Sequence, residues 1–146
     1  MKNYQITEWC HHFIREHVCR GKYKKIRRPI LVNNWEATYF DFTGDKLVEI
    51  ATEAKELGIE MFVLDDGWFG DRNSDTAGLG DYNVNKKKLP QGIKGLSERI
   101  NHMGLEFGLW FEPEAVNPDS DLYRAHPDWA LTDQFDPLYC RNELLL

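Results

Sequence analysis

The chain has 146 residues, of which 42% are hydrophobic, 13% aromatic and 29% charged. This composition excludes a disordered, collagen-like or solenoid chain, and the length excludes any large fold in full, such as an eight-unit (β/α) barrel of about 250 residues. The 24 Asp and Glu residues outnumber the 18 Lys and Arg residues and give a net charge of −6. We therefore expect no nucleic acid partner, because phosphate backbones select basic proteins.

No run of about 18 uncharged apolar residues is present, and the N-terminus lacks the apolar segment of a signal peptide. We therefore expect no membrane partner and a cytoplasmic location. The 3 cysteines form no C-x-x-C pair, which favours reduced thiols over a disulfide framework or a zinc site. We expect no cofactor.

The first thirty residues differ in pattern from the rest of the chain. Their apolar side chains recur with helical spacing at Ile6, Trp9, Cys10, Phe13, Ile14 and Val18. This stripe predicts an amphipathic helix that must pack against another surface, and Gly21 ends it. A basic segment with five Lys or Arg residues follows at 22–28, and Pro29 introduces a new pattern.

From residue 30 onward, short apolar runs alternate with helical periodicity. The expected strands are 30–32, 61–64 and 107–111, and a fourth run begins at 144–146. Thr43 is expected to cap a helix that ends at Gly58, and a second helix with apolar positions over 93–103 ends at Gly104. Strands that are apolar on both faces and alternate with helices indicate parallel β/α units, so the fold class is α/β.

A long loop rich in Asp, Asn and Gly occupies residues 68–90, after the second expected strand. Loops of this length are usually functional or mobile. In α/β proteins, ligands bind at the carboxyl ends of the strands, which is where this loop begins. The basic run at 86–88 within the loop is interpreted as solvated rather than as a binding patch.

Each of the three expected strands ends with a carboxylate near a tryptophan. These residues are Trp35 and Glu36, then Asp65, Asp66 and Trp68, then Trp110, Glu112 and Glu114. The carboxyl ends of parallel strands share one edge, so the three groups are expected to converge. Such a site suits a sugar, because a pyranose stacks its C–H face on an indole and donates its hydroxyls to carboxylates.

Each of these features also has a structural interpretation. The sequence Asp65-Asp66-Gly67 is a turn signal, and Trp110 lies in an apolar run that fits a core position. Glu112 and Glu114 flank a proline, and one of them fits an N-cap or a surface charge. Carboxylates at strand ends also hold Mg²⁺ or Zn²⁺ in many enzymes, although no histidine accompanies them here. A metal-dependent hydrolase is therefore the lower-ranked alternative.

Four motifs resemble those of the α-galactosidases of glycoside hydrolase family 36, in the same order. They are RPILVNNWEA at 28–37, GIEMFVLDDGWF at 58–69, GLWFEPE at 108–114 and HPDW at 126–129. The resemblance implies that residues 30–146 form the first three to four β/α units of a TIM (β/α)8 barrel, which stays incomplete. It implies that residues 1–29 are the helical connector preceding that barrel. It also implies an oligosaccharide substrate and the homo-oligomers common in this family.

The implied activity is retaining hydrolysis of terminal α-D-galactosyl residues, as in melibiose and raffinose. The family takes its nucleophile, the Asp of a Lys-x-Asp motif, and its acid/base Asp from later strands, so we expect no catalytic residue in this chain. The substrate-binding residues that carry over are Asp65, Asp66, Trp35, Trp110 and Arg141. Arg141 matches a Gly-Arg-Asn motif, with Cys140 in place of the glycine and Glu143 in place of a usual Gln.

The leading hypothesis is a segment of an α-galactosidase that carries part of the galactose subsite and is inactive by itself. The alternatives are a non-catalytic truncated fragment or pseudogene product, and a related galactosyltransferase. Three strands and a stub cannot close a barrel. We therefore expect an unpaired strand edge and an exposed apolar face.

Overall fold

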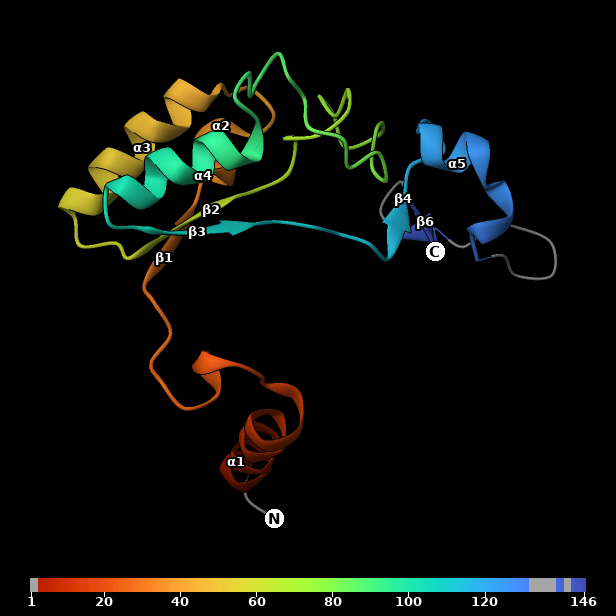
Figure 1. The fold of residues 1–146 in the computed structure, drawn as a ribbon. Helices are drawn as coiled ribbons and strands as arrows, with labels where there is room; N and C mark the ends of the chain where they lie inside the picture. Colours follow the sequence, from red (N-terminus) through yellow and green to blue (C-terminus); the bar gives the residue numbers. More distant parts are fainter. Residues whose placement is uncertain (1–2, 132–138, 141–142) are drawn as a thin grey trace.

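The computed structural model describes residues 3–131, 139–140 and 143–146. Figure 1 shows the order of the elements along the chain. The α-helices are α1 (Asn3–Phe13), α2 (Trp35–Thr38), α3 (Gly44–Glu56), α4 (Gly92–His102) and α5 (Asp121–Ala125). The strands are β1 (Leu31–Asn33), β2 (Met61–Leu64), β3 (Glu106–Leu109), β4 (Ala115–Val116), β5 (Tyr139–Cys140) and β6 (Glu143–Leu145).

Three strands form a parallel sheet in the order β1-β2-β3. Leu31 pairs with Met61, which in turn pairs with Glu106, so the three strands begin at the same level. Each pair of neighbouring strands is connected through a helix, α3 between β1 and β2 and α4 between β2 and β3. The α/β class with parallel strands, predicted from the alternation of apolar runs and helices, is confirmed.

Helices α3 and α4 lie side by side on one face of this sheet (Figure 1). Thr43 caps α3 as predicted, because its hydroxyl oxygen accepts a hydrogen bond from the Lys46 N–H at 3.3 Å. The core between the helices and the sheet contains Leu47, Ala51, Phe62, Leu64, Leu96 and Ile100, each at most 3% exposed. The apolar periodicity of the two helices therefore identifies the side chains that cover the sheet.

The opposite face of the sheet is open in the part of the chain that the structure describes. Alternation along the strands places Leu31, Met61 and Val63 on this face, since Phe62 and Leu64 point toward the helices. Leu31 is 55% exposed, and Met61 and Val63 are only partly buried. The exposed apolar face expected for an incomplete barrel is therefore present.

A second, smaller sheet pairs β4 with β6 and β6 with β5, both antiparallel. The prediction that residues 144–146 begin a fourth strand of the parallel series is therefore wrong. Leu144 is only 1% exposed and packs with Val116 and Ala130, and the Leu146 N–H donates to the Glu114 carbonyl at 2.9 Å. Because β4 offers a partner strand close by, the apolar run folds back on it.

The N-terminal segment contains the predicted helix in two parts, α1 and a π-helical turn at Ile14–Val18. Its apolar stripe is exposed, Trp9 by 77% and Phe13 by 56%. The surface against which this stripe would pack is not among the described residues. No described helix is long and apolar enough to cross a lipid bilayer.

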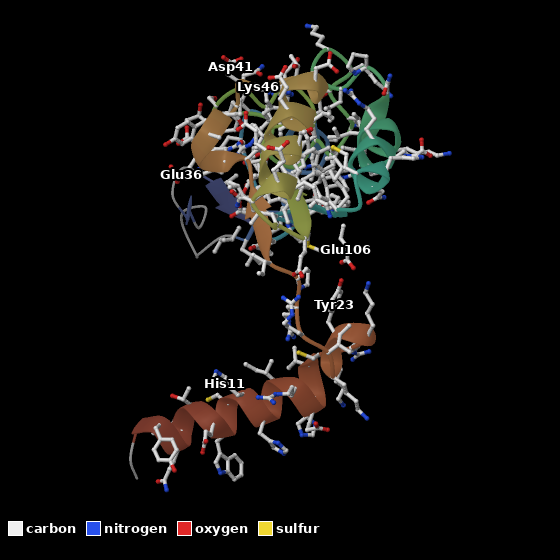
Figure 2. All side chains as sticks on the ribbon, turned by 90° about the vertical axis from the view of Figure 1, so that its left-hand side faces the viewer. His11, Tyr23, Glu36, Asp41, Lys46 and Glu106 are labelled. Atoms are coloured by element: carbon white, nitrogen blue, oxygen red, sulfur yellow. The ribbon has the colours of Figure 1, made fainter. Side chains whose placement is uncertain are left out.

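The basic segment after this helix is attached to the amino ends of the strands. Lys22 Nζ lies 2.9 Å from Glu106 Oε1, and Arg27 Nη2 lies 2.5 Å from Glu60 Oε1. The Tyr23 hydroxyl also donates to Glu106, toward which it points in Figure 2. These hydrogen bonds lower the pKa of both carboxyl groups: Tyr23 and then Lys22 act on Glu106, and Arg27 acts on Glu60.

Candidate functional site

The carboxyl ends of the three parallel strands bring four of the five predicted sugar-binding residues, Trp35, Asp65, Asp66 and Trp110, to one edge. The Asn34 side-chain oxygen, at the end of β1, accepts a hydrogen bond from the Asp65 N–H at 2.9 Å. The Trp110 N–H, at the end of β3, donates to the Leu64 carbonyl at 2.9 Å. Asp65 therefore lies between the residues that follow β1 and β3, and Trp35 directly follows Asn34 in α2.

The chain bends at Asp66 directly after β2, and we call residues 65–67 the 65–67 turn. Asp65 Oδ1 accepts the Asp66 N–H at 2.8 Å, and Asp66 Oδ1 accepts the Gly67 N–H at 2.6 Å. Gly67 has φ +93°, and a Cβ at this position would lie 2.9 Å from Phe40 Cδ1. The turn interpretation and the functional interpretation of this motif are therefore compatible, because the turn presents the partly buried Asp65 side chain at the strand edge.

The Asp66 carboxylate lies in the interior and is held by Arg72 from the long loop. Arg72 Nε lies 3.0 Å from Oδ1 and Nη2 lies 2.8 Å from Oδ2, a two-pronged ion pair. The exposed fractions of the two side chains are 2% and 9%. Arg72 Nη1 also donates to Asn117 Oδ1 at 2.6 Å and to the Ala77 carbonyl at 3.1 Å. Asp66 and Arg72 thus join the end of β2 to the loop and to the segment after β4.

Lys88 holds the same region from a second side. Its ammonium group donates to the carbonyl oxygens of Phe40 at 2.8 Å, Gly67 at 2.9 Å and Arg72 at 3.1 Å. Burial lowers its pKa, and the nearby charges of Asp66 and Asp41 act in the opposite direction. The interpretation of residues 86–88 as a solvated basic run holds for the exposed Lys86 and Lys87 and is wrong for Lys88.

The predicted aromatic residues differ in their surroundings. Trp35 is partly buried and makes edge contacts with Tyr39 and Phe40, with ring centroids 5.2 and 5.1 Å apart. Trp110 is partly buried and stacks on Phe69 at 6.4 Å. Trp68 is only 3% exposed, so it belongs to the core.

Tyr82 connects the long loop to the segment after β3. Its ring lies 6.0 Å from Trp68 and 5.1 Å from Phe111, and its hydroxyl oxygen accepts the Glu112 N–H at 3.1 Å. Burial raises the pKa of the Tyr82 hydroxyl, the hydrogen bond from the Glu112 N–H lowers it, and the charges of Glu112 and Asp66 raise it further. The phenol therefore stays protonated and helps to fix the backbone beyond Trp110.

The glutamates near the strand ends are less buried than Asp66. Glu36 is exposed and accepts a hydrogen bond from the Tyr39 hydroxyl at 3.2 Å. Glu114 is exposed, and Glu112 is partly buried. Arg141, the fifth predicted substrate-binding residue, lies outside the described residues. Within the described ranges, no three His, Cys, Asp or Glu side chains form a group that could hold a metal ion.

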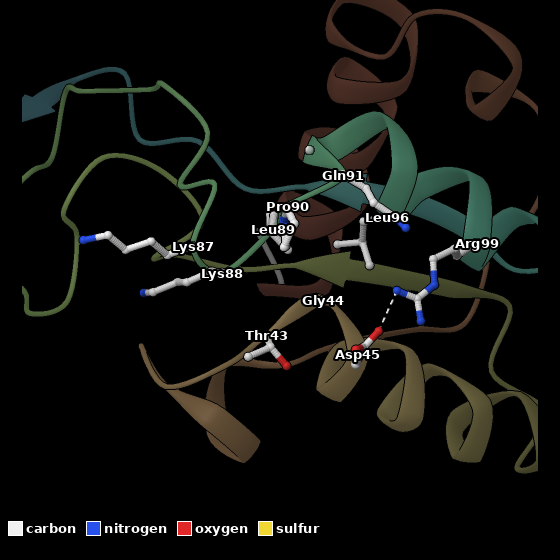
Figure 3. Close-up of a pocket in the computed structure, with 11 residues that line it drawn as sticks. Thr43, Gly44, Asp45, Lys87, Lys88, Leu89, Pro90, Gln91, Leu96 and Arg99 are labelled. Atoms are coloured by element: carbon white, nitrogen blue, oxygen red, sulfur yellow. Dashed lines mark ion pairs between the residues drawn. The ribbon is translucent and has the colours of Figure 1, made fainter.

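A cavity of about 300 Å³ lies between the first turns of α3 and α4 (Figure 3). Lys87, Pro90 and Gln91 contribute to its lining, and the ion pair between Asp45 and Arg99, 2.8 Å apart, closes one side. None of the four predicted sugar-binding residues that the structure describes, Trp35, Asp65, Asp66 and Trp110, lines it. The cavity is therefore separate from the strand-edge site.

Three residues that hold the 65–67 turn are not among the site residues predicted from the sequence. Asn34 holds the Asp65 N–H, Arg72 holds the Asp66 carboxylate, and Lys88 holds the Gly67 carbonyl. Asn34 is fully buried, and its position directly after the first apolar run was an available signal. Nothing in the local pattern distinguishes Arg72 or Lys88 from the other charged residues of the loop.

Comparisons with known proteins identify relatives of this chain. AgaSK of Mediterraneibacter gnavus, a bifunctional α-galactosidase/sucrose kinase, is 54% identical over 142 residues, which cover 97% of this chain and 15% of AgaSK. The α-galactosidase AgaA of Geobacillus stearothermophilus is 58% identical over 126 residues, covering 86% of this chain and 17% of AgaA. This chain thus spans less than a fifth of the length of these two relatives.

A crystal structure of an AgaA variant in complex with raffinose superimposes with a TM-score of 0.84 at 54% identity, covering 92% of this chain and 19% of the AgaA chain. The family model described as Melibiase matches residues 3–146. A match over nearly the whole length shows the family directly. The chain therefore belongs to the melibiase family, glycoside hydrolase family 36.

Proposed function

We propose that this chain forms one side of the galactose subsite of an α-galactosidase that removes terminal α-D-galactosyl residues from oligosaccharides such as melibiose and raffinose. The observation that carries the proposal is the strand edge at which Asp65 lies beside Trp110, in a chain of the melibiase family. Relatives support the sugar class, since AgaA variants are seen in complex with raffinose and with stachyose.

The roles within the subsite follow from the surroundings of each side chain. Asp65 Oδ1 accepts one backbone N–H, and the remaining lone pairs of this carboxylate are suited to sugar hydroxyls. Asp66 accepts from Arg72 on both oxygens and from the Gly67 N–H on Oδ1, and as the neighbour of Asp65 it is proposed to contact an adjacent sugar hydroxyl. Trp35 and Trp110 supply aromatic walls for the C–H face of the ring, and Arg141 contributes a further contact.

The hydrolytic carboxylates come from polypeptide outside these 146 residues. A retaining glycosidase needs a nucleophile and an acid/base about 5–5.5 Å apart on either side of the scissile bond. Asp66 is held in an ion pair by Arg72, and Asp65 is assigned to binding the sugar hydroxyls. Residues 1–29 then form a connector that precedes the barrel, and residues 30–146 form the N-terminal part of the barrel.

The test is a graft in which this chain replaces the matching segment of AgaA. We expect the graft to hydrolyse p-nitrophenyl α-D-galactopyranoside and to release galactose from raffinose. Product analysis with raffinose and sucrose present separates hydrolysis from galactosyl transfer. A graft that folds, as shown by cooperative thermal unfolding, yet binds neither galactose nor 1-deoxygalactonojirimycin contradicts the proposal; AgaA variants are known in complex with the latter.

A further inference from the structure

The ammonium group of Lys88 joins the segment at residue 40 to residues 67–72, and both lie at least 16 residues from Lys88 in the sequence. Its three N–H donors reach the carbonyls of Phe40 after α2, Gly67 in the 65–67 turn and Arg72 in the long loop. An ammonium group has three donors, so each is used. The charge also lies 4.9 Å from the centre of the Phe42 ring, a cation–π contact.

Two of these carbonyls lie beside the ion pair between Asp66 and Arg72. Gly67 follows Asp66 directly, and its N–H donates to the Asp66 carboxylate. Arg72 supplies the guanidinium that holds this carboxylate. Lys88 therefore connects the backbone of Gly67 with the backbone of Arg72. The ion pair connects the side chains of Asp66 and Arg72. The two connections together fix the orientation of the carboxylates on the turn.

The arrangement requires a compact cation. Methionine fills a similar volume but leaves three carbonyl oxygens without their donor in a partly buried site, which is unfavourable. Arginine keeps the charge, but its planar fork does not match three carbonyls that converge on one point. Lys87, the neighbouring residue, is exposed, whereas Lys88 is partly buried.

We propose that Lys88 is a positioning residue of the sugar site, which sets the orientation of Asp65 and Asp66 by holding the Gly67 and Arg72 carbonyls. The proposal rests on the function proposed above and extends it, because Lys88 acts on sugar affinity through the turn without touching the sugar. The expected signature is a loss of affinity in a protein that remains folded.

The test compares Lys88→Met with Lys87→Met in the AgaA graft. Isothermal titration calorimetry gives the Kd of 1-deoxygalactonojirimycin, and steady-state kinetics give KM and kcat for the aryl galactoside. We expect Lys88→Met to raise Kd and KM at least tenfold with a smaller change in kcat, and Lys87→Met to stay within twofold of the unsubstituted graft. A lower Tm with unchanged Kd overturns the proposal, since a purely structural residue behaves in that way.

Two further comparisons distinguish failure of the proposed function from failure of the role of Lys88. If the unsubstituted graft binds no sugar, the proposed function fails; if it binds and Lys88→Met binds equally well, only the role of Lys88 fails. If Lys88→Met does not fold, NMR on the unsubstituted chain decides. The hydrogen bond from the Lys88 ammonium group to the Gly67 carbonyl oxygen is detected as scalar coupling between Lys88 Nζ and the Gly67 carbonyl carbon; this coupling supports the proposal, and its absence overturns it.

Discussion

Arg72 and Asp66 form a two-pronged ion pair in the interior, with Nη2 2.8 Å from Oδ2 and exposed fractions of 2% and 9%. The pair lies one residue after Asp65, the carboxylate that we assign to the sugar. Arg72, like Lys88, attaches the long loop 68–90 to the end of β2, and it also attaches Asn117 there. Its loss affects both stability and the geometry of the site.

Replacing Arg72 with methionine is expected to destabilise the chain strongly. Removing one partner of a buried pair leaves the other charge uncompensated, which costs about 3–5 kcal/mol. Urea denaturation measures the change in the free energy of unfolding. The matched control is Arg124→Met, since Arg124 pairs with Asp119 and Asp121 on the surface and its loss is expected to cost less than about 1 kcal/mol. Similar costs for the two variants would show that the pair at Asp66 is not effectively buried.

Asp65→Asn in the AgaA graft is expected to reduce kcat/KM for an aryl α-galactoside severely. The substitution keeps the shape of the side chain and removes the charge that strengthens hydrogen bonds from sugar hydroxyls. Such bonds contribute about 1.5–3 kcal/mol, which corresponds to about 10- to 100-fold in kcat/KM. Glu53→Gln, at an exposed position on α3, is the control. A near-normal kcat/KM for Asp65→Asn would exclude the assigned role.

Gly67→Ala tests the close packing of the 65–67 turn. The added Cβ would lie 2.9 Å from Phe40 Cδ1 and 3.4 Å from Phe42 Cε1, at a residue with φ +93°. Gly58 is the control, because its φ is +85° and nothing lies within 4 Å of a Cβ there. We expect Gly58→Ala to cost about 1–2 kcal/mol from backbone strain alone and Gly67→Ala to cost about 1–3 kcal/mol more. Equal costs, measured by urea denaturation, would mean that the aromatic residues move aside freely.

The attachment of the N-terminal segment is expected to weaken in acid. The pKa values of Glu60 and Glu106 are lowered in the folded chain. The stability that their hydrogen bonds contribute is therefore fully present above the ordinary pKa of 4.5 and is lost as the pH falls through the lowered values. NMR titration of the two carboxyl carbons, with the Tyr23 ring signals as a reporter, follows this transition. Added salt is expected to shift both pKa values back toward 4.5, since these groups are exposed. Ordinary titration of Glu106 at low salt would argue against the attachment.

The isolated chain is expected not to hydrolyse an aryl α-galactoside. The function proposed above gives this chain part of the galactose subsite, whereas it assigns the two carboxylates that a retaining mechanism needs to polypeptide outside the 146 residues. The measurement is release of the aryl group by the purified chain at high protein concentration, with AgaA as the positive control. Clear turnover by the chain would place the reaction within these residues and reverse the assignment.

Much of the fold follows from local pattern. The apolar periodicity of α3 and α4, the cap at Thr43 and the apolar runs at β2 and β3 are properties of neighbouring residues, and the structure places these elements where the pattern predicts them. The run at 144–146 is the exception. Its partner, β4, is a two-residue strand that no periodicity reveals, so its antiparallel pairing could not be predicted.

The sequence by itself determined the α/β class, the strand ends on which Asp65 and Trp110 stand, and the family, because these depend on short motifs and on spacing along the chain. Only the tertiary structure decided that Asp66 is held by Arg72 and that Lys88 is turned inward while Lys87 is exposed. Those outcomes depend on which buried carbonyls and carboxylates come within about 3 Å of a cation. The folding of a long loop back onto the sheet sets such distances.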